Sequence, residues 1–300
     1  MINVLDFFVK AYAKLHNYPG VPVRVLTPFR IMVRYGAKTF LPGYLAKPEL
    51  TESKKKVGIT VSFTSFPARI DNVWQIVECM LRQTYQPEKI LLWLSKEQFP
   101  TPDSIPQSLR DREGERFQIR MVEGDIRSHK KYYYVSKELP DSLVFLIDDD
   151  IYYETHLIER VMSAYKEHPE AVICNYGYHI GRNEDGSLKP YKQWIHECHY
   201  STSDDLFFGS GGGTLFRPSE LYSDLTDIDK ARKLCPMADD IWLNAMVRLA
   251  GKKIVLLQNG GDVLSVYNPN NVELFRQNKM ESQNDGQIKA VNDYYQRQLF

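Results

Sequence analysis

The segment Leu143-Val144-Phe145-Leu146-Ile147-Asp148-Asp149-Asp150 joins five consecutive apolar residues to three aspartates. A short, unbroken apolar run of this kind is typical of a strand that is buried on both faces of a sheet. Thr155 follows where a helix is expected to begin, because its hydroxyl can accept a bond from a free backbone N–H. Ligands of open α/β sheets collect beyond the carboxyl ends of the strands, so the three carboxylates are predicted to lie at a binding edge.

Segments on both sides of this one predict a sheet with crossover helices. Apolar, β-rich runs occur at 57–63, 90–94, 117–122, 171–174 and 254–257. Helical patterns occur at 71–81, 130–139, 155–165 and 239–249. A strand, helix, strand order implies parallel pairing of the two strands. We therefore expect an α/β fold with a mostly parallel central sheet flanked by helices, while residues 176–206 give no clear assignment.

The chain is expected to divide into a basic amphipathic extension, a main α/β domain and a partly helical tail, at 1–56, 57–265 and 266–300. Residues 1–56 hold ten Lys or Arg residues and three acidic residues, with apolar residues interleaved. No apolar run approaches the roughly 18 residues of a membrane span, and Asp6 and Lys10 interrupt the core that a cleavable signal peptide would need. Residues 1–50 are expected either to lie on the inner face of a membrane or to pack on the main domain.

The overall composition gives no support for a nucleic-acid partner, because 38 Lys and Arg residues balance 38 Asp and Glu residues. The four cysteines are scattered without paired spacing, which favours reduced thiols in a cytoplasmic protein. His196, Cys198 and His199 cluster in the sequence. A structural zinc site there would need a second pair of ligands at the usual spacing, which is missing.

The aspartate run is a candidate metal site. Alternation along an extended chain turns Asp148 and Asp150 to the same side, so that both can hold one divalent cation, magnesium or manganese. An ion held by one or two carboxylates keeps coordination positions for phosphate oxygens. The alternative is that these residues are solvated aspartates in a turn, although three adjacent like charges repel one another.

Asp239 and Asp240 open the predicted helix at 239–249 and form a second acidic cluster. Carboxylates in a first helical turn are ordinary partners of the helix dipole. A carboxylate held rigidly beside a crevice could also act as the base that takes a proton from an acceptor hydroxyl. The residues alone leave both interpretations open.

Basic and glycine residues near the acidic clusters also have two interpretations. Lys130 and Lys131, and Arg69 after the first strand, could neutralise a diphosphate leaving group or could be solvated surface charges. The glycine run 211–213 could form a loop or bulge, or it could let the backbone approach a ligand closely. Trp194 and the tyrosines around it are expected to pack in the core rather than to bind a sugar.

Four stretches of the chain occur in a recognisable order. They are Thr64-Ser65-Phe66-Pro67-Ala68-Arg69-Ile70, Ile147-Asp148-Asp149-Asp150-Ile151-Tyr152-Tyr153, Gly211-Gly212-Gly213-Thr214-Leu215-Phe216 and Ala238-Asp239-Asp240-Ile241-Trp242-Leu243. Together they resemble glycosyltransferases of the GT-A nucleotide-binding fold, in particular a bacterial group of family-2-like sugar transferases with a DxD motif. The resemblance runs from about Val57 to Leu257, roughly two thirds of the chain.

The resemblance implies how a nucleotide-diphosphate sugar would be bound. The aspartate run, with Asp149 between the two metal ligands, would bind the ion and the ribose and diphosphate of the donor. The end of the first strand, from Thr64 to Arg69, would lie where the nucleotide base and ribose bind. Gly212 and Gly213 would line the cleft for the donor sugar and the acceptor.

The resemblance also implies the reaction. Asp240 matches the base of inverting members, with Asp239 as its neighbour and a contact of the acceptor. The chain is therefore expected to be a hexosyltransferase-like, inverting glycosyltransferase of polysaccharide biosynthesis. It would use manganese or magnesium and transfer a sugar to the hydroxyl of a saccharide or a lipid-linked acceptor.

Two departures and two alternatives accompany this prediction. Ser95-Lys96-Glu97 replaces a carboxylate that reads uracil in many members, and no histidine follows His199 as a further metal ligand, which leaves Asp262 as a substitute. A nucleotidyltransferase of similar fold would carry a glycine-rich basic loop after the first strand, whereas Ser65–Arg69 has no glycine. A catalytically inactive carbohydrate-binding protein would have no need for two mutually repelling acidic clusters.

Overall fold

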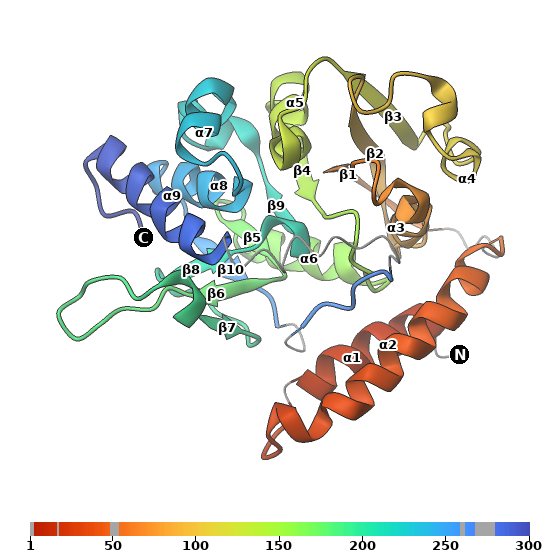
Figure 1. The fold of residues 1–300 in the computed structure, drawn as a ribbon, viewed down its shortest axis with the longest axis horizontal. Coiled ribbons are helices and arrows are strands. Elements are labelled where there is room, and N and C mark those ends of the chain that lie inside the picture. Colours follow the sequence, from red (N-terminus) through yellow and green to blue (C-terminus); the bar gives the residue numbers. More distant parts are fainter. Residues whose placement is uncertain (1–2, 17, 49–53, 259–261, 268–279) are drawn as a thin grey trace.

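The computed structural model describes residues 3–16, 18–48, 54–258, 262–267 and 280–300 (Figure 1). Its centre is a seven-stranded sheet with the order β10-β5-β9-β4-β1-β2-β3. The strands are β1 (Lys55–Thr64), β2 (Tyr85–Ser95), β3 (Phe117–Val122), β4 (Leu143–Leu146), β5 (Val172–Cys174), β9 (Thr214–Phe216) and β10 (Ile254–Leu256). All neighbouring pairs are parallel except those of β9, which runs antiparallel to both β4 and β5. The expected α/β fold with a mostly parallel central sheet is confirmed.

Helices cover both faces of the sheet, as the unbroken burial along the carboxyl-terminal halves of β1 and β2 requires. They are α3 (Val73–Leu81), α4 (Gln107–Arg110), α5 (Lys130–Glu138), α6 (Leu157–Glu167), α7 (Ile228–Leu234), α8 (Asp239–Leu249) and α9 (Met280–Tyr295). Leu92 of β2 belongs to the core that includes α3 and α6, whereas its neighbour Trp93 belongs to the core that includes α5 and α8. The site is therefore built on strands that are fixed from both sides.

A second, three-stranded sheet takes two of its strands from residues 176–206, for which the sequence gives no clear assignment, and its third strand begins at the end of that stretch. Its order is β7-β6-β8, with β6 (Gly177–His179), β7 (Ile195–Glu197) and β8 (Leu206–Phe208) all antiparallel. Each strand has only three residues, which is too short for an alternating pattern to stand out. Aromatic side chains pack it together, with the Trp194 and Phe207 rings 5.3 Å apart. Trp194 is 6% exposed, consistent with its expected packing role.

The basic extension forms two helices, α1 (Val4–His16) and α2 (Val23–Leu45), which lie side by side below the main body in Figure 1. Leu5 and Leu41 are fully buried in the same core cluster as α3 and α6. The buried Asp6 carboxylate accepts bonds from the backbone N–H (2.7 Å) and hydroxyl (2.8 Å) of Thr155, just before α6. Among the described residues no helix is long and apolar enough to cross a membrane.

Candidate active site

The aspartate run lies at the carboxyl end of β4, in the middle of the sheet. The backbone N–H of Asp148 donates to the carbonyl of Gly211 (3.2 Å) and to the Tyr153 hydroxyl (2.8 Å). On the other side the Val266 N–H donates to the carbonyl of Asp150 (2.7 Å). The run is thus fixed between the loop before β9 and the segment after Asp262.

Arg69 and Ser65, from the loop after β1, bind the second and third carboxylates. The Arg69 guanidinium lies 2.9 Å from an oxygen of Asp149 and 2.9 Å from an oxygen of Asp150. The Ser65 hydroxyl donates to the other oxygen of Asp149 (2.5 Å). Asp149 is only 5% exposed, so both of its oxygens are engaged within the protein. Its contacts in the structure tie β1 to β4.

Lys131, on the first turn of α5, joins the two acidic clusters. Its ammonium lies 2.8 Å from Asp148 and 2.9 Å from Asp239, and its side chain is only 4% exposed. Burial alone would lower the pKa of Lys131, but the nearby carboxylates, including Asp240, raise it well above its ordinary value. Lys131 is therefore charged, and it holds together residues that are about ninety positions apart in the sequence.

Asp239 and Asp240 begin α8, and their environments differ. The Asp240 carboxylate accepts bonds from the backbone N–H of Ser210 (2.9 Å) and from its hydroxyl. Burial and the charge of Asp239 raise the pKa of Asp240 to about 6, against the opposing effect of Lys131. Burial acts in the same direction on Asp239, but Lys131 outweighs it and the pKa of Asp239 is lowered. The pair thus contains one carboxylate whose pKa is lowered and one whose pKa is raised to about 6.

The glycine run packs directly on the acidic residues. A Cβ atom at Gly211 would lie 1.7 Å from a carboxylate oxygen of Asp148, and one at Gly212 would lie 2.1 Å from the Cβ of Tyr176. Gly213 has a φ of +106°, which strains any other residue. The run therefore needs glycine in order to turn beneath Asp148 and enter β9.

Three candidate residues have partners elsewhere. Thr64 donates its hydroxyl to the carbonyl of Trp93 (2.8 Å), on the neighbouring strand β2. Lys130, 2% exposed, pairs with Asp125. Asp262 pairs with Arg30 of α2 rather than with the aspartate run. Adjacent helical positions point about 100° apart, which explains why Lys130 and Lys131 meet different carboxylates.

Asp148 and Asp150 are the carboxylates of the run that could hold a cation shared with a phosphate ligand. Their side chains are 40% and 33% exposed, and one oxygen of Asp148 is engaged by Lys131. Burial and the neighbouring Asp149 raise the pKa of Asp150 to about 7 although Arg69 opposes this. Arg69 thus neutralises the negative charge around Asp150 only in part, and a bound divalent ion would reduce the repulsion between these carboxylates. These two carboxylates would leave most positions of the ion to water and phosphate oxygens.

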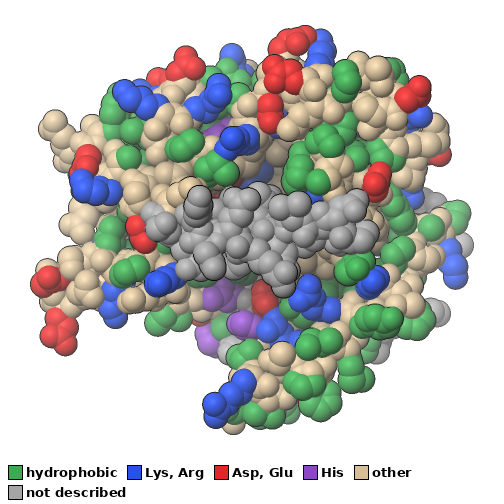
Figure 2. All heavy atoms as spheres, viewed as in Figure 1, with side chains coloured by type: hydrophobic (Ala, Val, Ile, Leu, Met, Phe, Trp, Pro, Cys, Tyr) green, Lys and Arg blue, Asp and Glu red, His purple; other side chains and the backbone are tan. Residues whose placement is uncertain are grey.

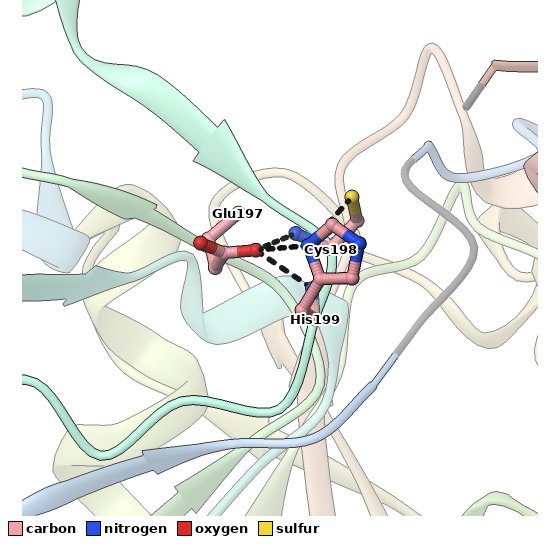
Figure 3. Close-up of side chains that lie close together, drawn as sticks. All are labelled: Glu197, Cys198 and His199. Atoms are coloured by element: carbon pink, nitrogen blue, oxygen red, sulfur yellow. Dashed lines mark hydrogen bonds and ion pairs between the residues drawn. The ribbon is translucent and has the colours of Figure 1, made fainter. Parts of the chain in front are cut away.

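Figure 3 shows a second cluster of ligand-type side chains: Glu197, Cys198 and His199. One Glu197 oxygen accepts the backbone N–H groups of Cys198 (2.8 Å) and His199 (2.7 Å) and lies 2.9 Å from the His199 ring nitrogen. These are the contacts of a tight turn among consecutive residues. His196, grouped with this pair in the sequence, packs instead on Tyr176, with ring centroids 4.5 Å apart.

A cavity of about 350 Å³ separates α1 from the loops around the site. Its wall includes Val9 and Lys10 of α1, Glu154, Arg160 and Gly212. Glu154 pairs with both Lys10 (3.1 Å) and Arg160 (2.7 Å), and with Asp262 the wall holds two acidic and two basic residues. The cavity adjoins the glycine run on the side of the N-terminal helices.

Comparison with known proteins yields likeness in fold only. No family model matches the chain, and no curated protein matches it in sequence. An apo UDP-glucose pyrophosphorylase aligns with a TM-score of 0.42 and 12% identity over 81% of this chain and 99% of its own. A 2-C-methyl-D-erythritol 4-phosphate cytidylyltransferase from Thermus thermophilus aligns with a TM-score of 0.39 and 14% identity over 71% and 93%. Both are nucleotidyltransferases, but similarity at this level does not carry an activity across.

The residues that sequence reasoning missed are mostly hydroxyl-bearing. Ser65, Ser210 and Tyr153 bind the carboxylates or backbone of the two acidic clusters. Ser65 and Tyr153 lie within the stretches 64–70 and 147–153, and Ser210 directly precedes the glycine run. Their position in or beside these stretches is the one signal in the sequence, because a single serine or tyrosine forms no periodic pattern.

Proposed function

We propose that this chain is a metal-dependent glycosyltransferase. It would move a sugar from a nucleotide-diphosphate donor to a hydroxyl of a saccharide or a lipid-linked acceptor, as a step of polysaccharide biosynthesis. The proposal rests on one observation: the buried ammonium of Lys131 contacts both Asp148 and Asp239. It thereby brings the acidic cluster proposed to hold the metal next to the acidic cluster proposed to supply the base. A transfer between two bound substrates needs both functions at one place.

On the donor side, manganese or magnesium held by Asp148 and Asp150 would supply the positive charge that neutralises the departing diphosphate. Arg69 and Lys131 would keep the carboxylates in position and limit their mutual repulsion. Gly212 and Gly213 would let the donor sugar approach the backbone. Thr64, Lys130 and Asp149 remain predicted donor contacts, although each has a partner within the protein.

On the acceptor side, Asp240 is the better candidate for the base. With a pKa of about 6 it is ionised at neutral pH and still basic enough to accept a proton from a hydroxyl group. Asp239 is paired with Lys131, so it is a weaker base that would orient the acceptor. Direct attack by an acceptor that is deprotonated in this way corresponds to inversion at the anomeric carbon. Cys79, Cys174 and Cys235 are buried thiols, which supports a cytoplasmic location.

The second candidate is a nucleotidyltransferase, the class of enzyme to which the two similar structures belong. The loop after β1 argues against it, because Arg69 is committed to Asp149 and Asp150 and the loop has no glycine to wrap a triphosphate. The third candidate is a catalytically inactive carbohydrate-binding protein. It would not explain why the pKa of the Asp240 carboxylate is raised to about 6.

One assay separates the three. The purified protein is incubated with a panel of nucleotide sugars and manganese, with and without acceptor saccharides or pyrophosphate. We expect release of nucleoside diphosphate that depends on an acceptor and is lost in Asp240→Asn. Formation of nucleoside triphosphate from the nucleotide sugar and pyrophosphate would establish the nucleotidyltransferase instead. Saccharide binding without either product would establish the inactive binding protein.

A further inference from the structure

The two N-terminal helices have two apolar faces, and only one of them packs on the protein. The inner face is buried in the core, with Leu5, Leu41 and Leu45 fully enclosed. It is held further by Asp6, which binds Thr155, and by Arg30, which binds Asp262. Packing on the main domain therefore accounts for one side of the helix pair and leaves the other side to be explained.

The opposite side of α2 carries a stripe of large exposed apolar residues. Val25, Phe29, Met32 and Tyr35 are separated by four, three and three positions, so they lie along one face of the helix. We name these four residues the outer stripe. Their exposed fractions run from 54% at Phe29 to 71% at Tyr35. Figure 2 shows hydrophobic side chains along the outer side of this helix pair, at the lower right.

The exposed charges that α1 and α2 carry are all of one sign. Within α1 and α2 the single acidic residue is Asp6, and its carboxylate is turned inward. Arg24, next to Val25 in the sequence, Arg34 and Lys38 are exposed basic residues of the same helix, and the Lys38 ammonium lies over the ring of Tyr267, 3.4 Å from its centroid. A helix with an exposed apolar stripe and several exposed basic residues is suited to the interface of an anionic bilayer.

We propose that the outer stripe and its basic neighbours dock this protein on the surface of an anionic lipid bilayer. The helix would lie in the plane of the headgroups, with Phe29 and Met32 inserted among the acyl chains and Arg24 near lipid phosphates, while the other basic residues of the helix add to the attraction by the anionic surface. A symmetric contact with a second copy of the chain fits less well. It would bring two sets of basic residues together with no exposed acid on these helices to pair with them. The inference does not depend on the reaction that the site catalyses.

The test is flotation with vesicles in a density gradient. The full chain is mixed at low salt with vesicles of phosphatidylcholine alone or with about one third phosphatidylserine. We expect it to float with the anionic vesicles only, and to float less at high salt because surface charges are then screened. The double variant Phe29→Ser/Met32→Ser should lower the partition coefficient by at least about tenfold, since each of these side chains gains from leaving water.

A charge variant tests the second half of the surface. Arg24→Gln/Arg34→Gln/Lys38→Gln should lower partition onto anionic vesicles by about a hundredfold, since each basic residue near such a surface contributes about fivefold. Tyr294→Ser, a change of an exposed aromatic residue on α9, is the matched control and should float like the wild type. Point variants are needed because removing residues 1–50 would also remove the buried Leu5 and Leu41. Thermal unfolding of every variant should match the wild type, since the changed side chains are exposed.

Several results would overturn the proposal. The intact protein could stay at the bottom of the gradient with anionic vesicles at low salt. It could float equally well after the Phe29→Ser/Met32→Ser change, which would place the contact elsewhere. Light scattering could also show a dimer that this double variant abolishes, without any vesicle binding. The occupant of the outer stripe would then be a second copy of the chain.

Discussion

Lys131 is the single residue on which the candidate site depends most. It is enclosed with three carboxylates, and two of them, on Asp148 and Asp239, contact it directly. A buried ion pair contributes little net stability when it is compared with apolar residues, but removing one partner leaves an uncompensated buried charge. The lysine therefore serves two purposes: it offsets the repulsion between the buried carboxylates, and it fixes the distance between the two acidic clusters.

The first prediction follows from that asymmetry. Lys131→Met should lower the free energy of unfolding by about 3 kcal/mol or more, because Asp239 is left buried without its partner. Lys137→Met, on the exposed side of the same helix, is the control and should change it by less than about 0.5 kcal/mol. Urea denaturation measures both. Adding Asp239→Asn to Lys131→Met should recover part of the loss, and a loss that persists in full would assign it to packing instead of charge.

The second prediction concerns the pH dependence that Asp240 introduces. Its pKa in the folded protein, about 6, lies above the ordinary value of 3.8, so the folded state binds this proton more tightly than the unfolded state does. The stability that it contributes is complete below about pH 4 and is lost as the pH rises through 6. Transfer activity should move the opposite way, since only the ionised carboxylate accepts a proton.

Melting temperatures and initial rates between pH 4.5 and 8 check this prediction. Asp150, whose pKa is raised to about 7, also lowers the stability as the pH rises. The effect of Asp240 is therefore obtained by comparing the wild type with Asp240→Asn, since both proteins keep Asp150. The variant should lose transfer, keep donor binding and show a flatter stability profile. Identical profiles for the two proteins would remove Asp240 as the group that titrates.

At the scale of elements, the N-terminal helices join the main domain through few polar contacts. Asp6 of α1 accepts two bonds from Thr155, just before α6, and the Arg82 guanidinium donates to the carbonyls of Leu45 (2.9 Å), the last residue of α2, and of Lys47 (2.6 Å), just after it. These contacts enclose polar groups among buried leucines. They therefore determine where the helices dock on the core.

The third prediction tests this docking. Asp6→Ala should lower the free energy of unfolding by about 3 kcal/mol, because the N–H and hydroxyl of Thr155 would lose a charged acceptor within the core. Asp103→Ala is the control, since that carboxylate is 93% exposed and should matter little. Chemical denaturation monitored by tryptophan fluorescence measures the difference. An unchanged value for Asp6→Ala would mean that apolar contacts alone position α1.

The elements also show which features a sequence can predict. Long apolar runs predicted β1, β2 and β4, because burial on both faces leaves a strong signal. The antiparallel direction of β9 was not predicted, since three residues carry no information about direction and the reversal is made by the turn at Gly211–Gly213. In the site, the acidic clusters were visible as patterns. The separate partners of Lys130 and Lys131, and the contacts of Ser65 and Ser210, depend on three-dimensional proximity and have no counterpart in the sequence.

At the scale of the whole molecule, the site is assembled from segments spread over most of the chain. Arg69, Lys131, Asp148, Ser210 and Asp240 come from five separate loops or helix ends on one edge of the sheet. Such a site forms only when the whole sheet has folded and brings these segments together. Ligand binding is therefore coupled to the stability of the entire fold, and thermal unfolding reports on it.

The last prediction uses this coupling to test the metal site. Carboxylates and a diphosphate repel each other, so a nucleoside diphosphate should stabilise the protein only when manganese or magnesium is present. At about one hundred times the dissociation constant the gain is ~2.7 kcal/mol, which corresponds to a rise in Tm of roughly 4 °C for a chain of this size. Asp150→Asn should abolish the rise, whereas Asp141→Asn, at an exposed position before β4, should retain it. A nucleoside diphosphate that raises Tm equally with and without the metal would show that Asp148 and Asp150 do not hold an ion for it.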